Sequence, residues 1–208
     1  MASPVTLIII LITTVVSIIE INARKNGKYD IFYNFAEWPY KIAEERKYYQ
    51  IFTSGLLHAD YVHLFFNMFT LYSFGTVLET IFVKRTGTAE GSIDFLLIYL
   101  ISMLLGSIIT VLFNYKDEGY VAVGASGAVS GIIFSYILFF PKSMVGMFFI
   151  PMPAWLFAIV YIGISLYGMN QKFGNIGHEA HLGGALGGIL ATLFLVKGSF
   201  QILISYLR

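Results

Sequence analysis

Apolar residues along the chain gather into six runs that are separated by shorter polar stretches. A helix needs about 20 mostly apolar residues to cross a bilayer. The runs therefore predict six membrane-spanning helices, at about 5–22, 61–82, 94–114, 124–140, 153–169 and 178–196. We expect an all-α membrane protein with a single domain over residues 1–208, because no internal repeat or second domain is visible.

The stretch 22–60 is unlike these runs, because basic and aromatic residues alternate along it. It is too charged to span a membrane and too aromatic for a simple linker. A loop of this length is uncommon unless it is functional. We expect it to lie partly inserted in the membrane interface, with short helices around 34–47.

Composition agrees with an integral membrane protein. Of the 208 residues, 57% are hydrophobic and 12% are charged, whereas soluble domains have about 25% charged residues. The net charge of +1 offers no electrostatic case for nucleic-acid binding. The absence of cysteine excludes disulfides, thiolate metal sites and a cysteine nucleophile.

Polar residues open every second apolar run. His63 and Asn67 stand at the start of the second, Ser126 at the start of the fourth and His181 at the start of the sixth. Alternate spans enter the membrane from the same side, so these residues should share one depth. Polar residues inside a membrane are costly and are functional candidates by default.

Small residues surround Ser126 in the segment 124–131, GASGAVSG. The serine is a candidate nucleophile if other residues supply a base and an oxyanion site. Alternatively, Gly127 and Gly131 form a small-residue face for helix packing, and the two interpretations are compatible. The pattern is GxSG, not GxSxG, and no strand is predicted before it, so the nucleophile elbow of soluble hydrolases is not expected.

His181 is the candidate base, since an imidazole can take the serine proton near neutral pH and return it to a leaving amine. The alternative is a hydrogen bond that only packs helices. Glu179 lies two residues away and points to a different helix face. We therefore predict a Ser126–His181 dyad without a third member.

His63 and Asn67 are four residues apart and share one helix face. With the backbone N–H of Ser126 they can donate hydrogen bonds to an oxyanion, or they can simply tie the second span to its neighbours. A metal site formed by the four histidines is a weaker alternative, because no carboxylate stands at zinc-like spacing. We expect no metal and no cofactor, and we expect His58 and His178 to hold loops.

Glycines in the fourth and sixth spans should let these helices approach closely and bring Ser126 and His181 within reach. The predicted packing residues are Gly124, Gly127, Gly131, Gly184 and Gly188.

Three motifs together give a resemblance to a known family. GASG at 124–127, AHLGG at 180–184 and HLFFN at 63–67 occur on successive even spans, and Gly75 and Glu79 fit the end of the second helix. The chain resembles, over nearly its whole length, the rhomboid family of intramembrane serine proteases. The resemblance implies a six-helix bundle with a cavity open to the extracytoplasmic side, the serine–histidine dyad and the oxyanion site.

The resemblance also implies transmembrane protein substrates, an acyl-enzyme, no cofactor and a place in a bilayer, here the bacterial inner membrane. The fifth helix and the loop before His181 would form the gate and the cap. Of the 13 lysines and arginines, eight lie on the side of the long loop. The positive-inside rule would put that side in the cytoplasm, against the orientation that the resemblance implies. Without the long loop the balance is five to two the other way, so charge alone does not decide the orientation.

Two departures from the family stand out. The Trp-Arg pair that often precedes the HxxxN helix is replaced by Tyr49-Gln50, and an aromatic residue that stacks on the base in some members is replaced by Ser130. An inactive relative that binds membrane helices is one alternative, although this chain keeps both Ser126 and His181. A transporter is another, but no repeat or pair of broken helices supports it.

Overall fold

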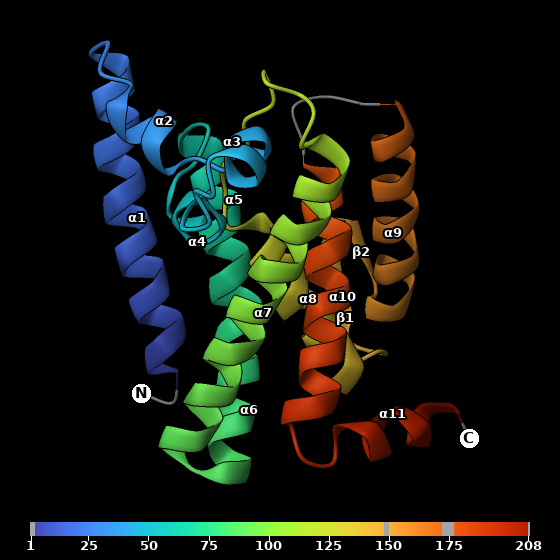
Figure 1. Cartoon of the computed structure of the whole chain (residues 1–208). Coiled ribbons are helices and arrows are strands. Elements are labelled where there is room, and N and C mark those ends of the chain that lie inside the picture. The colour runs from blue at the N-terminus through green and yellow to red at the C-terminus, as the bar shows by residue number, and fades with distance from the viewer. Residues whose placement is uncertain (1–2, 148–149, 172–176, 208) are drawn as a thin grey trace.

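The computed structural model describes residues 3–147, 150–171 and 177–207, and these are mostly helical (Figure 1). The helices and helical turns are α1 (Pro4–Lys25), α2 (Asp30–Phe35), α3 (Pro39–Glu44), α4 (Gln50–Thr53), η1 (Ser54–Leu56), α5 (Tyr61–Thr70), η2 (Leu71–Gly75), α6 (Thr76–Thr86), α7 (Thr88–Asn114), α8 (Ser126–Phe139), α9 (Ala154–Gln171), α10 (His178–Leu195) and α11 (Ser199–Leu207). The all-α membrane fold is confirmed.

Apolar helices occupy all six predicted runs, but they differ in length. In the described residues three are long and apolar enough to cross a membrane, and a fourth is added if α10 and α11 are counted as one bent span. Helices α8 and α9 are apolar but shorter. The number of six complete spans therefore stays a prediction.

Three features differ from the pattern-based expectation. The second run is not one regular helix, because the π-helical turn η2 separates α5 from α6. The connection between the fourth and fifth runs contains two strands that were not predicted, with β1 (Met144–Met147) antiparallel to β2 (Ile150–Pro153). After α10 the chain bends by 114° into α11, which was not predicted. Gly198 permits this bend with a φ of +82°.

A buried carboxylate ties α1 to the bundle. Glu79 accepts hydrogen bonds from the Val5 and Thr6 amides at 3.0 and 2.8 Å and from the Thr6 and Ser92 hydroxyls at 2.7 Å each. A buried polar group requires such hydrogen-bond partners. The four bonds join the start of α1 to α6 and α7, at the end of the molecule opposite to α2–α4 (Figure 1).

Helix α10 lies in backbone contact with α8 through paired glycines. A Cβ atom built on Gly184 would lie 1.9 Å from the carbonyl oxygen of Gly127, and one built on Gly188 would lie 2.2 Å from that of Gly131. Neither backbone oxygen can move aside without displacing its helix. No side chain other than hydrogen fits at these two positions, so the glycines set the separation of α8 and α10.

Candidate active site

The four candidate residues lie at one end of the bundle. His63 is in the first turn of α5, Ser126 is the first residue of α8, and His181 is in the first turn of α10. All three helices begin at the end where α2–α4 lie (Figure 1). His63, Ser126 and His181 are half-buried and Asn67 is buried. Three of the four residues are therefore partly accessible, and none is fully exposed.

The close packing of α8 and α10 brings the neighbours of Ser126 and His181 in the chain into contact. Gly127 directly follows Ser126, and Ala180 directly precedes His181. A Cβ atom on Gly127 would lie 3.2 Å from the Ala180 carbonyl oxygen. Among the described residues, no hydrogen bond joins the Ser126 hydroxyl to His181. Such bonds are often long in proteins without substrate and tighten when substrate binds.

Gly124 allows the chain to turn into α8 beside His63. Its φ is +130°, a conformation that side chains with a Cβ rarely adopt. A Cβ there would also lie 2.7 Å from Cε1 and 3.1 Å from Nε2 of His63. The Gly124 amide donates to the carbonyl of Ser54 at 3.0 Å. Glycine at this position therefore lets the imidazole of His63 approach the backbone just before Ser126.

Hydrogen bonds at the start of α5 define the orientation of His63. The Asp60 carboxylate caps the helix by accepting from the His63 amide at 2.8 Å. The Ala59 amide lies 3.5 Å from Nδ1 of His63 and donates toward it. With Nδ1 as acceptor, a neutral imidazole carries its proton on Nε2, the nitrogen that lies toward Gly124. Asn67 donates through Nδ2 to the His63 carbonyl at 3.0 Å and keeps its second N–H.

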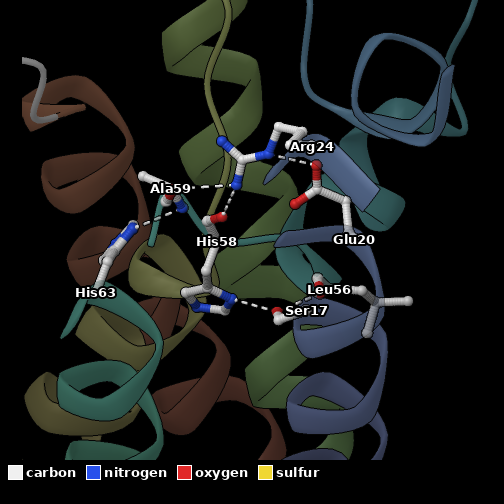
Figure 2. Close-up of polar contacts among 7 residues, drawn as sticks. All are labelled: Ser17, Glu20, Arg24, Leu56, His58, Ala59 and His63. Atoms are coloured by element: carbon white, nitrogen blue, oxygen red, sulfur yellow. Dashed lines mark hydrogen bonds and ion pairs between the residues drawn. The ribbon is translucent and has the colours of Figure 1, made fainter. Parts of the chain in front are cut away.

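His58 links α1 to the segment that precedes Ser126, and Figure 2 shows its contact with Ser17 of α1. The Ser17 hydroxyl donates its only proton to the Leu56 carbonyl at 2.7 Å, so Nδ1 of His58, 2.8 Å away, donates to Ser17. Nε2 is then the acceptor for the Ala125 amide at 3.5 Å. Burial, together with the neighbouring His63, lowers the pKa of His58 to about 3. His58 is thus neutral at physiological pH and uses both nitrogens to hold neighbouring segments.

Arg24 holds the same segment from the end of α1. Its guanidinium donates to the carbonyls of His58 and Ala59 at 2.8 and 3.0 Å, and it is paired with Glu20 one turn earlier (Figure 2). A guanidinium has several fixed donors and can bind two carbonyls and a carboxylate at once. Arg24 therefore fixes the chain between η1 and α5, where His63 begins its helix.

Glu37 lies behind the loop that leads into α8. Its backbone pairs with Ala122 through two hydrogen bonds of 2.9 Å. Its carboxylate accepts from the Ser107 hydroxyl at 3.1 Å, while Oε1 has no hydrogen-bond partner among the described residues. Burial, only partly opposed by Ser107, raises the pKa of Glu37 to about 7. The carboxyl group therefore titrates near neutral pH. Its backbone partner Ala122 precedes Gly124 by two residues.

The sequence model of the rhomboid domain matches residues 45–198. The chain belongs to the rhomboid family. It is 28% identical over 152 residues to "Rhomboid protein 1, mitochondrial" of Saccharomyces cerevisiae, covering 71% of this chain and 42% of that protein.

Two further relatives match a similar share of this chain at a similar identity. "RHOMBOID-like protein 12, mitochondrial" of Arabidopsis thaliana is 32% identical over 167 residues, covering 73% of this chain and 47% of that protein. "Rhomboid protease GluP" of Bacillus subtilis is 32% identical over 149 residues, covering 72% and 26%. The chain thus spans less than half of the length of these relatives. The match establishes an integral membrane protein of the rhomboid family.

The loop that this rhomboid chain carries before α5 is held without the Trp-Arg pair. Gln50, at one of the departing positions, is fully buried. It donates to the Asn34 carbonyl at 3.1 Å and accepts from the Trp38 amide at 3.2 Å. These bonds join α4 to the segments around α2 and α3, so Gln50 and Arg24 together anchor the loop.

Two other expectations concern metal and the cap. Among the residues that the structure describes, no three His, Cys, Asp or Glu side chains lie close enough together to hold a metal ion. The predicted cap loop before His181 falls largely on residues 172–176, which lie outside the described ranges. The predicted gate is α9.

Sequence reasoning missed three residues at the site. Arg24 was counted only as a loop charge, although its spacing from Glu20 within an apolar helix is a signal for a buried ion pair. Glu37 was not singled out, because its partners Ala122 and Ser107 are distant from it in the sequence. Tyr161, in α9, contacts His181 with ring centroids 5.9 Å apart. A lone tyrosine in an apolar run carries little signal, since tyrosine is common in membrane helices.

Proposed function

We propose that this rhomboid protein is an intramembrane serine endopeptidase that cleaves transmembrane segments of single-pass membrane proteins. Ser126 is the nucleophile and His181 is its general base. The observation that carries the proposal is the contact of α8 with α10, where the residue after Ser126 meets the residue before His181. Relatives named as proteases support the same class of reaction.

In the proposed reaction, His181 takes the hydroxyl proton as Ser126 attacks the scissile carbonyl. The resulting oxyanion accepts hydrogen bonds from the Ser126 amide, Nε2 of His63 and Nδ2 of Asn67. The amide is available because the first N–H groups of a helix have no partner within it. His181 then donates its proton to the leaving amine, and water hydrolyses the acyl-enzyme. Each oxyanion donor commonly contributes about 10²–10³ in rate.

The substrate must present extended backbone to Ser126, because a helical peptide bond is shielded by its own turn. Substrates should therefore unwind easily near the cut, and glycine, alanine or serine there would favour this. We place the cut near the outer end of the substrate helix, with the site open to the extracytoplasmic side of a bacterial inner membrane. No cofactor takes part in this proposal.

The test is reaction of the purified protein, in lipid, with a fluorophosphonate probe that modifies activated serines. Ser126→Ala and His181→Ala are run in parallel, with thermal unfolding as the check of folding. We expect labelling of the wild type and none in either variant. Folded wild-type protein that does not react would overturn the dyad and favour the alternative of a silent family member that binds membrane helices.

A further inference from the structure

Tyr161 of α9 contacts both α8 and α10. Tyr161 is hydrogen-bonded through its hydroxyl to Ser130, and Ser130 Oγ donates to the carbonyl of Ser126 at 2.7 Å. A serine hydroxyl has one proton, so the proton in the first bond comes from Tyr161. The resulting chain of hydrogen bonds runs from α9 through Ser130 to the backbone of Ser126.

The ring of Tyr161 also contacts His181. The two ring centroids are 5.9 Å apart, with an angle of 34° between the planes. Aromatic pairs attract one another at such separations, about 4.5–7 Å. Phe157 stacks with Tyr161 at 5.7 Å and Phe134 meets it edge-on at 5.5 Å. The tyrosine ring is therefore held on several sides and presents a fixed surface to the imidazole.

The His181 imidazole has two ring neighbours. Within the described ranges its side chain makes no hydrogen bond, and its other ring neighbour is His178, with centroids 6.2 Å apart. A general base must direct one nitrogen at the proton that it abstracts. Rotation of an imidazole about χ2 is otherwise broad. A neighbouring ring that restricts this rotation thus has a direct effect on proton transfer.

We propose that Tyr161 is a positioning residue that holds the His181 imidazole toward Ser126. The proposal rests on the proposed function, since it assigns His181 its role as base. The ring comes from α9, and Ser130 of α8, four residues after the proposed nucleophile, is hydrogen-bonded to its hydroxyl.

The test compares the fluorophosphonate labelling rates of Tyr161→Phe and Tyr161→Leu with that of the wild type. Phenylalanine keeps the ring and loses only the bond to Ser130, so labelling should fall by no more than about 5-fold, since a neutral hydrogen bond is worth about 1 kcal/mol and about 1.4 kcal/mol is tenfold in rate. Leucine removes the ring, and labelling should fall on the order of 10- to 100-fold, as for a misplaced catalytic group. Tyr167→Leu is the matched control, because Tyr167 is on the same helix and is 65% exposed.

An exchange variant separates positioning from a merely structural role. Tyr161→Leu combined with Ser130→Tyr returns an aromatic ring to the imidazole from α8, and we expect it to recover labelling relative to Tyr161→Leu alone. Wild-type labelling in Tyr161→Leu would overturn this inference and leave the proposed function intact. So would a Tyr161→Leu variant that loses thermal stability and labelling together, with no recovery in the exchange. An unreactive wild type would instead overturn the proposed function itself.

Discussion

The proposed nucleophile and the proposed base are held in different ways. The backbone before Ser126 is fixed by Ser54, His58 and the pairing of Glu37 with Ala122, and Gly124 packs against His63. The His181 side chain has the rings of Tyr161 and His178 as neighbours and makes no hydrogen bond among the described residues. The nucleophile is thus part of the hydrogen-bonded framework, whereas the base depends on side-chain packing from α9. Substitutions near Ser126 should affect folding and reactivity together, and those near His181 should affect mainly reactivity.

We expect the largest effect on stability and reactivity from a substitution that disrupts the contact between α8 and α10. Gly184→Ala places a Cβ atom 1.9 Å from the Gly127 carbonyl oxygen, so α8 and α10 must separate. We expect a loss of about 1–3 kcal/mol of stability, or more, and no probe labelling. Gly163→Ala is the control, because a Cβ there meets nothing within 4 Å and alanine favours a helix by up to about 1 kcal/mol. Equal thermal midpoints in the two variants would refute the proposed close packing.

The framework on the nucleophile side is tested next by Gly124→Ala. The new Cβ would oppose the φ of +130° and collide with His63. We expect about 1–3 kcal/mol of destabilisation from strain and a labelling rate lower by on the order of 100-fold. Gly27→Ala serves as the control for strain alone, since Gly27 has a φ of +74° and no atom within 4 Å of a Cβ. If both variants label like the wild type, the contact between His63 and Gly124 has no part in the site.

The lowered pKa of His58 should make the stability of the fold depend on pH. Its pKa is lowered from 6.5 to about 3 by burial, so the unfolded chain binds a proton between these values and the folded chain does not. Stability is complete above about pH 6.5 and falls as the pH is lowered toward 3, by up to about 1.4 kcal/mol per pH unit. Thermal unfolding of wild type and His58→Gln across this range measures it. The slope should be smaller in the variant, and an unchanged slope would assign it to other groups.

The raised pKa of Glu37 should give a smaller pH dependence of stability with the opposite sign. Its pKa is raised from 4.5 to about 7 by burial, so the folded chain retains a proton that the unfolded chain releases. Stability therefore falls as the pH rises from about 4.5 to 7 and remains lower above it. Glu37→Gln keeps the shape without the charge, and we expect it to be more stable than wild type at pH 8 and similar at pH 4. A variant that is less stable at pH 8 would show that the carboxylate is stabilised by contacts.

Much of the fold was predictable because membrane helices are long and apolar. The starts of α5, α8 and α10 agree closely with their apolar runs, and the Asp60 cap explains the start of α5. The turn η2 and the helix α11 were not predictable from hydropathy, because neither changes the apolar character of the chain. The strand pair of β1 and β2 was missed for a related reason, since a short apolar segment between prolines is compatible with several structures.

Part of the candidate site was likewise predictable from the sequence, and part was not. Ser126, His181 and His63 could be selected because they open alternate apolar runs, and Asn67 and the glycines because residues at helical spacing share a face. The sequence by itself therefore determined a membrane protein of the rhomboid family and the residues on which its proposed chemistry depends. Only the tertiary structure decided that Ser17 and Ala125 define the tautomer of His58, that burial raises the pKa of Glu37, and that a ring from α9 meets His181. These contacts join residues far apart in the chain, and their geometry depends on how the helices pack.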